Sequence, residues 1–83
     1  MIWKYRNRRL YCNEESRYIT YADLIGRLRR GDRVKVMDRK TGDDITAAAL
    51  CGALEEGVRS GAIRVEIADI VRLICPERLS AAA

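Results

Sequence analysis

The chain has 83 residues, of which 48% are hydrophobic and 34% charged, and it carries a net charge of +4 at pH 7. This length predicts one small domain with a modest core, and this composition excludes a disordered chain or a membrane-spanning protein. Histidine is absent and the three cysteines have no paired spacing. We therefore expect a soluble, cytoplasmic protein that is not an enzyme and has no disulfide framework, metal or cofactor.

Basic residues are concentrated in the first half of the chain. Residues 1–40 contain twelve Lys or Arg against five Asp or Glu, a surplus of seven, whereas residues 41–83 contain four against seven, a deficit of three. Such a split indicates that the amino-terminal half faces a polyanion.

Three short strands are predicted first. Aromatic and β-branched residues in Ile2–Tyr5 and Arg9–Cys12 flank the sequence RNRR. This pattern predicts two strands joined by a tight basic turn in which Asn7 takes a positive φ. The sequence NEES then predicts a second turn, and Arg17–Thr20 a third strand. We therefore expect a small basic β-meander in the amino-terminal third.

A helix is expected next, because Thr20 followed by Asp23 is a variant of the capping box. Gly31 is the expected stop signal. Apolar residues between these two signals recur at helical spacing and predict one buried stripe. They are Tyr21, Leu24, Ile25 and Leu28.

A fourth strand is predicted at Arg33–Asp38, where apolar and charged residues alternate, followed by a turn with Gly42. Thr46 is the expected N-cap of a second helix, and Gly57 and the Ser-Gly pair at 60–61 mark its fraying end. The predicted apolar face of that helix consists of Ala47, Leu50, Cys51, Leu54 and Val58.

The last segment is ambiguous, because Ile63–Ile67 alternates like a strand while a longer window fits a helix. Length favours a helix over Val65–Cys75, ended by Pro76, with a tail at 77–83. The predicted fold is therefore α+β: a single domain, 1–83, in which a small basic β-meander or ribbon packs on two or three short helices.

The basic turn has the chemistry of a DNA reader. A two-stranded ribbon fits the major groove, where arginine bonds guanine and asparagine bonds adenine, and other basic residues hold phosphates. Asn7 either reads adenine or shapes the turn, and at most one of Arg8 and Arg9 enters a groove because adjacent strand residues face opposite ways. Arg39 and Lys40 reach phosphate or form a solvated pair. The candidate DNA-binding residues are Lys4, Arg6, Asn7, Arg8, Arg9, Arg17, Arg39 and Lys40.

The aromatic residues have two interpretations. Tyr5, Tyr11 and Tyr18 either pack or offer stacking platforms, and packing is the more common role. We expect Trp3 in the core or at a dimer interface.

Two stretches carry a resemblance to a known family. KYRNRRLYCNEESRYIT (4–20) and VMDRKTGDDIT (36–46) resemble the amino-terminal DNA-binding domain of the polyhydroxyalkanoate synthesis repressor family, whose members show K-Y-x-N-R-R-L-Y-D early and D-x-x-T-G-x-D-I/L-T later. The likeness runs from about Ile2 to Glu56, and Cys12 stands where the family usually has aspartate. After Glu56 it is weaker, although IADIVRLI is similar to a helix that follows in the family. The matching residues are Lys4, Tyr5, Asn7, Arg8, Arg9, Leu10, Tyr11, Ser16, Tyr18, Ile19, Thr20, Asp38, Thr41, Gly42, Asp44, Ile45 and Thr46.

The resemblance implies a bacterial regulator of carbon storage. Such proteins repress genes for granule-associated proteins (phasins), often together with their own gene, and leave DNA when they bind nascent polyester granules. We therefore expect a sequence-specific repressor that binds double-stranded DNA as a homodimer, with the polyhydroxyalkanoate (PHA, including PHB) granule surface as a further partner. The alternatives are an RNA-binding module, since a basic ribbon with tyrosines also suits single strands, and a domain that binds the granule or a protein without specific DNA binding.

Overall fold

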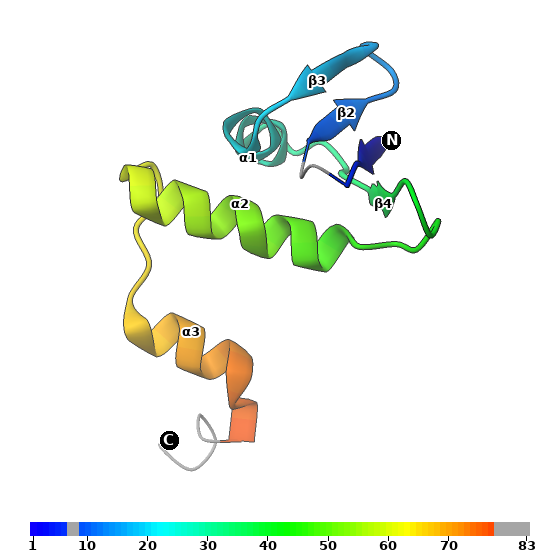
Figure 1. Cartoon of the computed structure of the whole chain (residues 1–83). Helices are drawn as coiled ribbons and strands as arrows, with labels where there is room; N and C mark the ends of the chain where they lie inside the picture. The colour runs from blue at the N-terminus through cyan, green and yellow to red at the C-terminus, as the bar shows by residue number, and fades with distance from the viewer. Residues whose placement is uncertain (7–8, 78–83) are drawn as a thin grey trace.

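The computed structural model describes residues 1–6 and 9–77, and four of its elements form one sheet (Figure 1). The strands are β1 (Ile2–Lys4), β2 (Leu10–Cys12), β3 (Arg17–Ile19) and β4 (Val36–Asp38). Their order in the sheet is β3-β2-β1-β4, with β1 antiparallel to β2, β2 antiparallel to β3, and β1 parallel to β4. The expected meander is therefore the β1–β3 part of the sheet, and the expected α+β fold is confirmed.

Three helices complete the fold: α1 (Tyr21–Arg29), α2 (Thr46–Ser60) and α3 (Ile67–Ile74). Helices α1 and α2 pack on one face of the sheet, and α2 lies between the sheet and α3 (Figure 1). Alternate strand residues point into this core because successive side chains on a strand face opposite ways. The buried core residues are Ile2, Leu10, Cys12, Ile19, Leu24, Ile25, Val36, Ala49 and Ala53.

The capping box at the start of α1 forms as expected. The Thr20 hydroxyl accepts from the backbone N–H of Asp23 at 3.1 Å, and the Asp23 carboxylate accepts from the N–H of Thr20 at 2.9 Å. Gly31, just after the helix, has φ +86°, a conformation that costs glycine little. Leu28 departs from the predicted stripe: it is 40% exposed, because it lies at the rim of the contact between α1 and α2.

The predicted buried face of α2 is wrong. Ala47 and Cys51 are exposed and Val58 is 44% exposed, whereas Leu50 and Leu54 are half-buried. The buried residues are Ala49, Ala53 and Gly57, whose small size lets α2 approach α1 closely. Gly57 therefore lies in the packed part of the helix, since a Cβ there would stand 2.4 Å from Cδ1 of Ile63, while the end of the helix is Ser60 with Gly61 at φ +84°.

The expected N-cap role of Thr46 is also wrong, because Thr46 is the first residue of α2 and Ile45 occupies the cap position. The Thr46 hydroxyl instead accepts from the backbone N–H of Val36 at 2.9 Å and donates to the Asp44 carboxylate at 2.6 Å. It thus ties the start of the helix to β4.

Other boundaries also differ from the expectation. Strand β4 starts at Val36 rather than at Arg33, although Val34 packs against the core as the alternation predicted. The ambiguous last segment is a helix, α3, which is shorter by two residues at its start and one at its end than predicted and stops before Pro76. No residue of α3 is buried.

Candidate nucleic-acid interface

A hydrogen-bonded loop between β4 and α2 positions Arg39 and Lys40. The Asp38 carboxylate accepts from the backbone N–H of Lys40 at 2.8 Å and of Thr41 at 3.0 Å. The N–H of Gly42, whose φ is +79°, donates to the Asp38 carbonyl at 2.8 Å. The N–H of Arg39 donates to the Lys4 carbonyl at 2.9 Å, which attaches the loop to β1.

Hydrogen bonds lower the pKa of two carboxylates in this loop, Asp38 and Asp44. The pKa of Asp38 lies below its ordinary value of 3.8 because the N–H groups of Thr41 and Lys40 donate to the charged form. The pKa of Asp44 is also lowered, by the Thr46 hydroxyl and then by the Thr46 N–H. These acids therefore organise the loop that presents the two basic residues.

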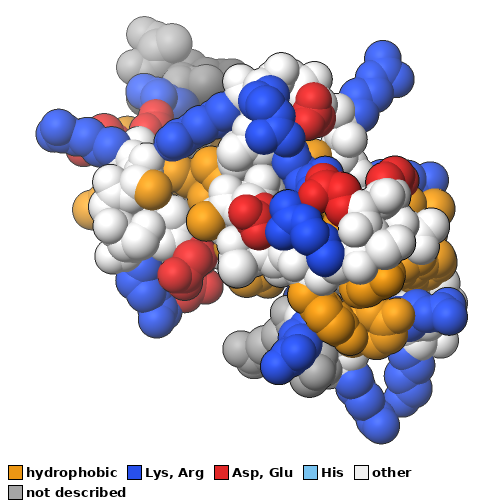
Figure 2. Space-filling view, turned by 90° about the horizontal axis from the view of Figure 1, so that it is seen from above, with side chains coloured by type: hydrophobic (Ala, Val, Ile, Leu, Met, Phe, Trp, Pro, Cys, Tyr) orange, Lys and Arg blue, Asp and Glu red, His pale blue; other side chains and the backbone are white. Residues whose placement is uncertain are grey.

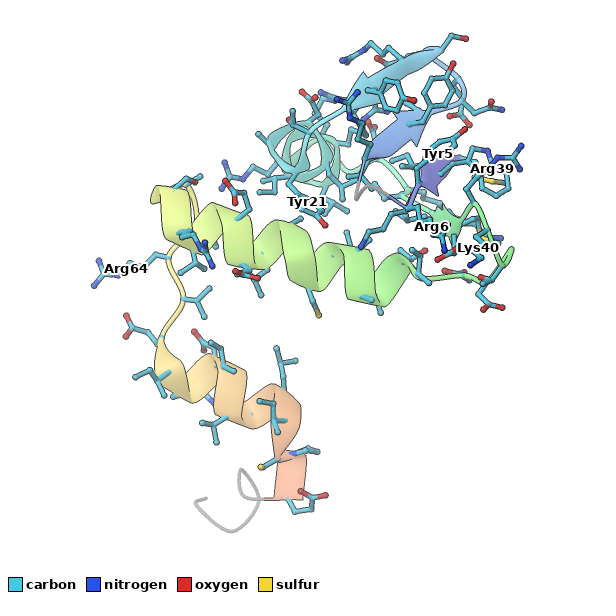
Figure 3. The ribbon with its side chains drawn as sticks, viewed as in Figure 1. Tyr5, Arg6, Tyr21, Arg39, Lys40 and Arg64 are labelled. Atoms are coloured by element: carbon cyan, nitrogen blue, oxygen red, sulfur yellow. The ribbon has the colours of Figure 1, made fainter. Side chains whose placement is uncertain are left out.

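Four basic residues meet where this loop approaches the turn after β1. We call Lys4, Arg6, Arg39 and Lys40 the cationic end. A cleft of about 420 Å³ there is lined by Lys4, Arg6 and Lys40 together with Asp38. Figure 3 shows Arg6, Arg39 and Lys40 together at this end and Arg64 at the other end of the molecule. Over residues 1–6 and 9–77, none of the four forms an ion pair with a carboxylate.

The other predicted DNA-binding residues are placed differently. The guanidinium of Arg9 lies over the ring of Tyr18, with its carbon 5.3 Å from the ring centroid. Arg17 lies on β3 and pairs with Glu15 at 2.7 Å and with Asp23 at 3.9 Å. Asn7 and Arg8 lie outside the described residues. The structure thus brings Arg6, Lys4 and the loop residues together and holds Arg17 in carboxylate contacts.

Tyr5, Tyr11 and Tyr18 do not belong to the core, contrary to the packing that we expected, and Trp3 also lies outside it, which leaves its predicted alternative, a dimer interface. Trp3, Tyr11 and Tyr18 stand in register on β1, β2 and β3, on the sheet face opposite the core residues of these strands. Tyr5 follows β1 and contacts the other two tyrosines. We call Trp3, Tyr5, Tyr11 and Tyr18 the aromatic face. The signal for it was the strand alternation, since each of the three in-register residues neighbours a core residue in sequence.

Other kinds of site have no support in the residues that the structure describes. They contain no group of three or more Cys, Asp or Glu able to hold a metal ion. None of their helices has the length and apolar character needed to cross a bilayer.

Comparison with known proteins gives one family. The model of the PHB/PHA accumulation regulator DNA-binding domain matches residues 1–61, which run from the start of the sheet to the end of α2. An uncharacterized protein of Allochromatium vinosum is 41% identical over 61 residues, 74% of this chain and 40% of that protein. A protein of Thiocystis violacea, named "Uncharacterized protein in phbA 5′ region", is 41% identical over 61 residues, 74% of this chain and 44% of that protein. The chain thus matches less than half the length of either relative, and no solved structure matches it.

The matched region contains every element that builds the interface. It includes the first hairpin, the capping box of α1, and the loop in which Asp38, Gly42 and Thr46 make the hydrogen bonds described above. The family is one of DNA-binding regulators rather than enzymes. The expected relationship is confirmed, and the chain belongs to the family of PHB/PHA accumulation regulator DNA-binding domains.

Proposed function

We propose that this protein binds double-stranded DNA with sequence preference and represses genes for polyhydroxyalkanoate granule proteins, the phasins, in the bacterial cytoplasm. The observation that carries the proposal is the cationic end. Its four basic side chains come from two separate segments, three of them (Lys4, Arg6 and Lys40) border one cleft, and none of the four forms an ion pair with a carboxylate among the described residues. A cluster of this kind suits the phosphates of a duplex.

The proposal divides the basic residues by role. The cationic end contacts phosphates, which fix the register without reading sequence. At the turn of the first hairpin, Asn7 and one of Arg8 and Arg9 contact base edges in the major groove. Arg17 contributes least, because its pair with Glu15 at 2.7 Å has to break before it can bind a phosphate.

The regulated genes are proposed from the family and from one relative. The family is described as regulating PHB/PHA accumulation, and the Thiocystis violacea relative is named for the 5′ region of phbA. On these grounds we propose that this chain represses granule genes and leaves DNA when it binds the granule surface.

We also propose that the protein acts as a homodimer. Helix α3 supports this, since Ile67, Leu73 and Ile74 are 81%, 77% and 72% exposed. An apolar groove of about 420 Å³ between α1 and α2, bordered by Ile25 and Leu50, would receive the α3 of a second copy. Light scattering after gel filtration should give twice the chain mass, and Ile67→Glu should give the monomer mass. A parent that is monomeric at all concentrations would contradict the dimer.

DNA binding is tested by gel-shift titration at several salt concentrations with promoter and scrambled duplexes. Arg6→Gln and Lys40→Gln should each weaken binding to both duplexes and reduce the slope of log affinity against log salt by about 0.9. The reason is that each variant removes one phosphate contact and the counterion release that accompanies it.

Arg64→Gln is the matched control. It removes the same charge from a side chain that is 93% exposed at the opposite end of the molecule (Figure 3). Its salt slope should equal that of the parent. Equal losses in all three variants would mean that only net charge matters, and unchanged binding by Arg6→Gln and Lys40→Gln would exclude the cationic end.

A further inference from the structure

The aromatic face is a surface that the helices leave open. Helices α1 and α2 pack on the face that carries Ile2, Leu10 and Ile19, while the register pairs Trp3 with Tyr11 and Tyr11 with Tyr18 on the other side. The three in-register residues therefore form one row across three adjacent strands. A row of aromatic side chains on neighbouring strands stands about 5 Å apart from one ring to the next.

The three tyrosine rings of the aromatic face hold one another in place. The ring centroids of Tyr11 and Tyr18 are 5.2 Å apart at an interplanar angle of 74°, and the Tyr5 ring lies 6.4 Å from Tyr11 and 6.3 Å from Tyr18. These are edge-to-face contacts, which stabilise the array without help from the core. Tyr18 is nevertheless 52% exposed, whereas Trp3, Tyr5 and Tyr11 are half-buried, so Tyr18 is the most accessible ring of the aromatic face.

Two arginines lie against this face. The guanidinium carbon of Arg39 is 5.0 Å from the ring centroid of Trp3, and that of Arg9 is 5.3 Å from the ring centroid of Tyr18. The surface therefore combines flat rings with positive charge at both sides of the row. Figure 2 shows a patch of hydrophobic and aromatic side chains over the sheet end of the molecule, bordered by Lys and Arg.

We propose that the aromatic face binds single-stranded nucleic acid, with unpaired bases stacked on Tyr18 and its neighbours and phosphates held by Arg9 and Arg39. The flat side of a base is available for such stacking only when the base is unpaired or unstacked. A duplex hides these sides within its own stack and offers only base edges and phosphates. This activity uses a different part of the molecule from the cleft of the cationic end. It shares two residues with the proposed duplex binding: Arg39, which belongs to the cationic end, and Arg9, which is a candidate base reader.

Charge decides between a nucleic acid and other occupants of this face. An apolar polymer would gain from the rings but would have to desolvate the Arg39 guanidinium, which forms no ion pair among the described residues, without offering it an anion. A single strand supplies both a stacking partner and a phosphate at each nucleotide. The observed combination therefore favours the single strand.

The test uses the fluorescence of Trp3, the one tryptophan of the chain. The protein is titrated with a thymine oligonucleotide of about 12 nucleotides, a length typical of single-strand sites, and separately with a duplex of the same length. The single strand should quench Trp3 with a saturating curve. Tyr18→Ala should raise the dissociation constant by about 5- to 150-fold, the cost of losing one stacked base, and Tyr18→Phe should retain the parent affinity.

The outcomes separate this proposal from duplex binding. The duplex should quench Trp3 less than the single strand does, because it contacts Arg39 beside the Trp3 ring but does not stack on the rings, and Tyr18→Ala should leave the duplex affinity unchanged. Absence of quenching by the single strand, parent affinity in Tyr18→Ala, or equal quenching and affinity with the duplex would each overturn the proposal. Thermal unfolding of Tyr18→Ala checks that the exposed substitution leaves the fold intact, and Arg64→Gln should bind the single strand as the parent does.

Discussion

At the scale of single residues, Asp38 orders the loop that carries the basic residues Arg39 and Lys40. Its carboxylate accepts two backbone N–H groups, and its own N–H donates to the Asp43 carbonyl at 2.8 Å. A negative charge beside the proposed phosphate-binding surface would by itself oppose DNA binding. Its presence there is explained by the loop that it holds.

A pair of substitutions separates these two effects of Asp38. Asp38→Asn and Asp38→Ala remove the same charge, but only asparagine keeps an oxygen that can accept the N–H groups of Lys40 and Thr41. We expect Asp38→Asn to bind a promoter duplex at least as tightly as the parent, and Asp38→Ala to bind about 3- to 10-fold more weakly than Asp38→Asn. Gel-shift titration measures both. Equal affinities of the two variants would show that the loop conformation does not matter for binding.

Several carboxylates with lowered pKa values make the free energy of unfolding depend on pH. The pKa of Asp23 is lowered chiefly by the N–H of Thr20, and that of Glu15 by the hydrogen bonds from Arg17 and then Arg27; Asp38 and Asp44 are lowered as described above. A carboxylate whose pKa is lower in the folded state stabilises it at all pH values above its unfolded-state pKa. That contribution is lost as the pH falls through the folded-state pKa.

We therefore expect the denaturant midpoint to be constant from pH 7 to about pH 5 and to fall below that. Urea titrations across the acid range, followed by circular dichroism, measure it. Asp23→Asn is the comparison variant: it should have a lower midpoint at neutral pH and a shallower decline in acid. A parent midpoint that rises as the pH falls would contradict the direction of these shifts.

At the scale of elements, α2 depends on small residues for its packing. Ala49 and Ala53 are buried against the sheet and α1, and Gly57 faces Ile63 and Ile25. A Cβ at Gly57 would lie 2.4 Å from Cδ1 of Ile63 and 3.2 Å from Cδ1 of Ile25. The absence of a side chain at this position therefore lets Ile63 fold back onto α2 and lets Ile25 of α1 approach it.

Two glycine-to-alanine substitutions test this packing. Gly57→Ala should destabilise the protein by about 1–3 kcal/mol, because displacing Ile63 outweighs the gain in helix propensity. Gly26→Ala, in α1, meets no atom within 4 Å and should stabilise the protein by up to about 1 kcal/mol. Chemical denaturation at neutral pH measures both free energies of unfolding. Stabilisation by Gly57→Ala would mean that the helices can separate without cost.

The elements themselves were largely predictable from the sequence, and the face of α2 was not. The capping box of Thr20, the strand runs and the glycine stops are local signals, so they could be read without knowing the fold. Periodicity selected the large apolar residues of α2, such as Leu54, but α1 approaches so closely that only alanine and glycine fit between the helices. That choice depends on the partner helix, which the local pattern does not contain.

The candidate site was predictable to the same extent. The basic residues of the first hairpin and of the later loop were visible as charge, and the sequence did not tell which would meet a carboxylate, as Arg17 meets Glu15. The aromatic face was missed because both sides of β1–β3 carry large apolar side chains. The alternation of side chains along these strands then gives two apolar sheet faces that the sequence does not distinguish. Only the positions of α1 and α2 decide which face is buried as the core.

At the scale of the whole molecule, α3 stands apart from the rest of the chain. It lies on the far side of α2 from the sheet, and none of its residues is buried (Figure 1). The connection before it is fixed only up to Ile63, whose N–H donates to the Gly57 carbonyl at 3.0 Å. Among the described residues, every buried core residue therefore lies in the sheet, α1 or α2.

Removing α3 should leave that core folded. A variant that ends at Glu66 should differ from the parent by less than about 0.5 kcal/mol in free energy of unfolding when both are measured in dilute solution. At higher concentration only the parent should become more stable, since dimerisation stabilises by mass action. Thermal unfolding at several concentrations measures both effects. Unfolding of the truncated chain would show that α3 belongs to the core.

The position of β1 has a consequence for how the protein is made. β1 is an inner strand, with β2 on one side and β4 on the other. It leaves the ribosome before both of them, and β4 starts only at Val36. Until then the nascent chain holds a strand with one unprotected edge next to Trp3, which is the kind of segment that recruits other chains. Interruption of translation before Val36 would therefore yield a fragment that is prone to aggregate. The sheet becomes complete only when β4, in the second half of the matched domain, has emerged and paired with β1.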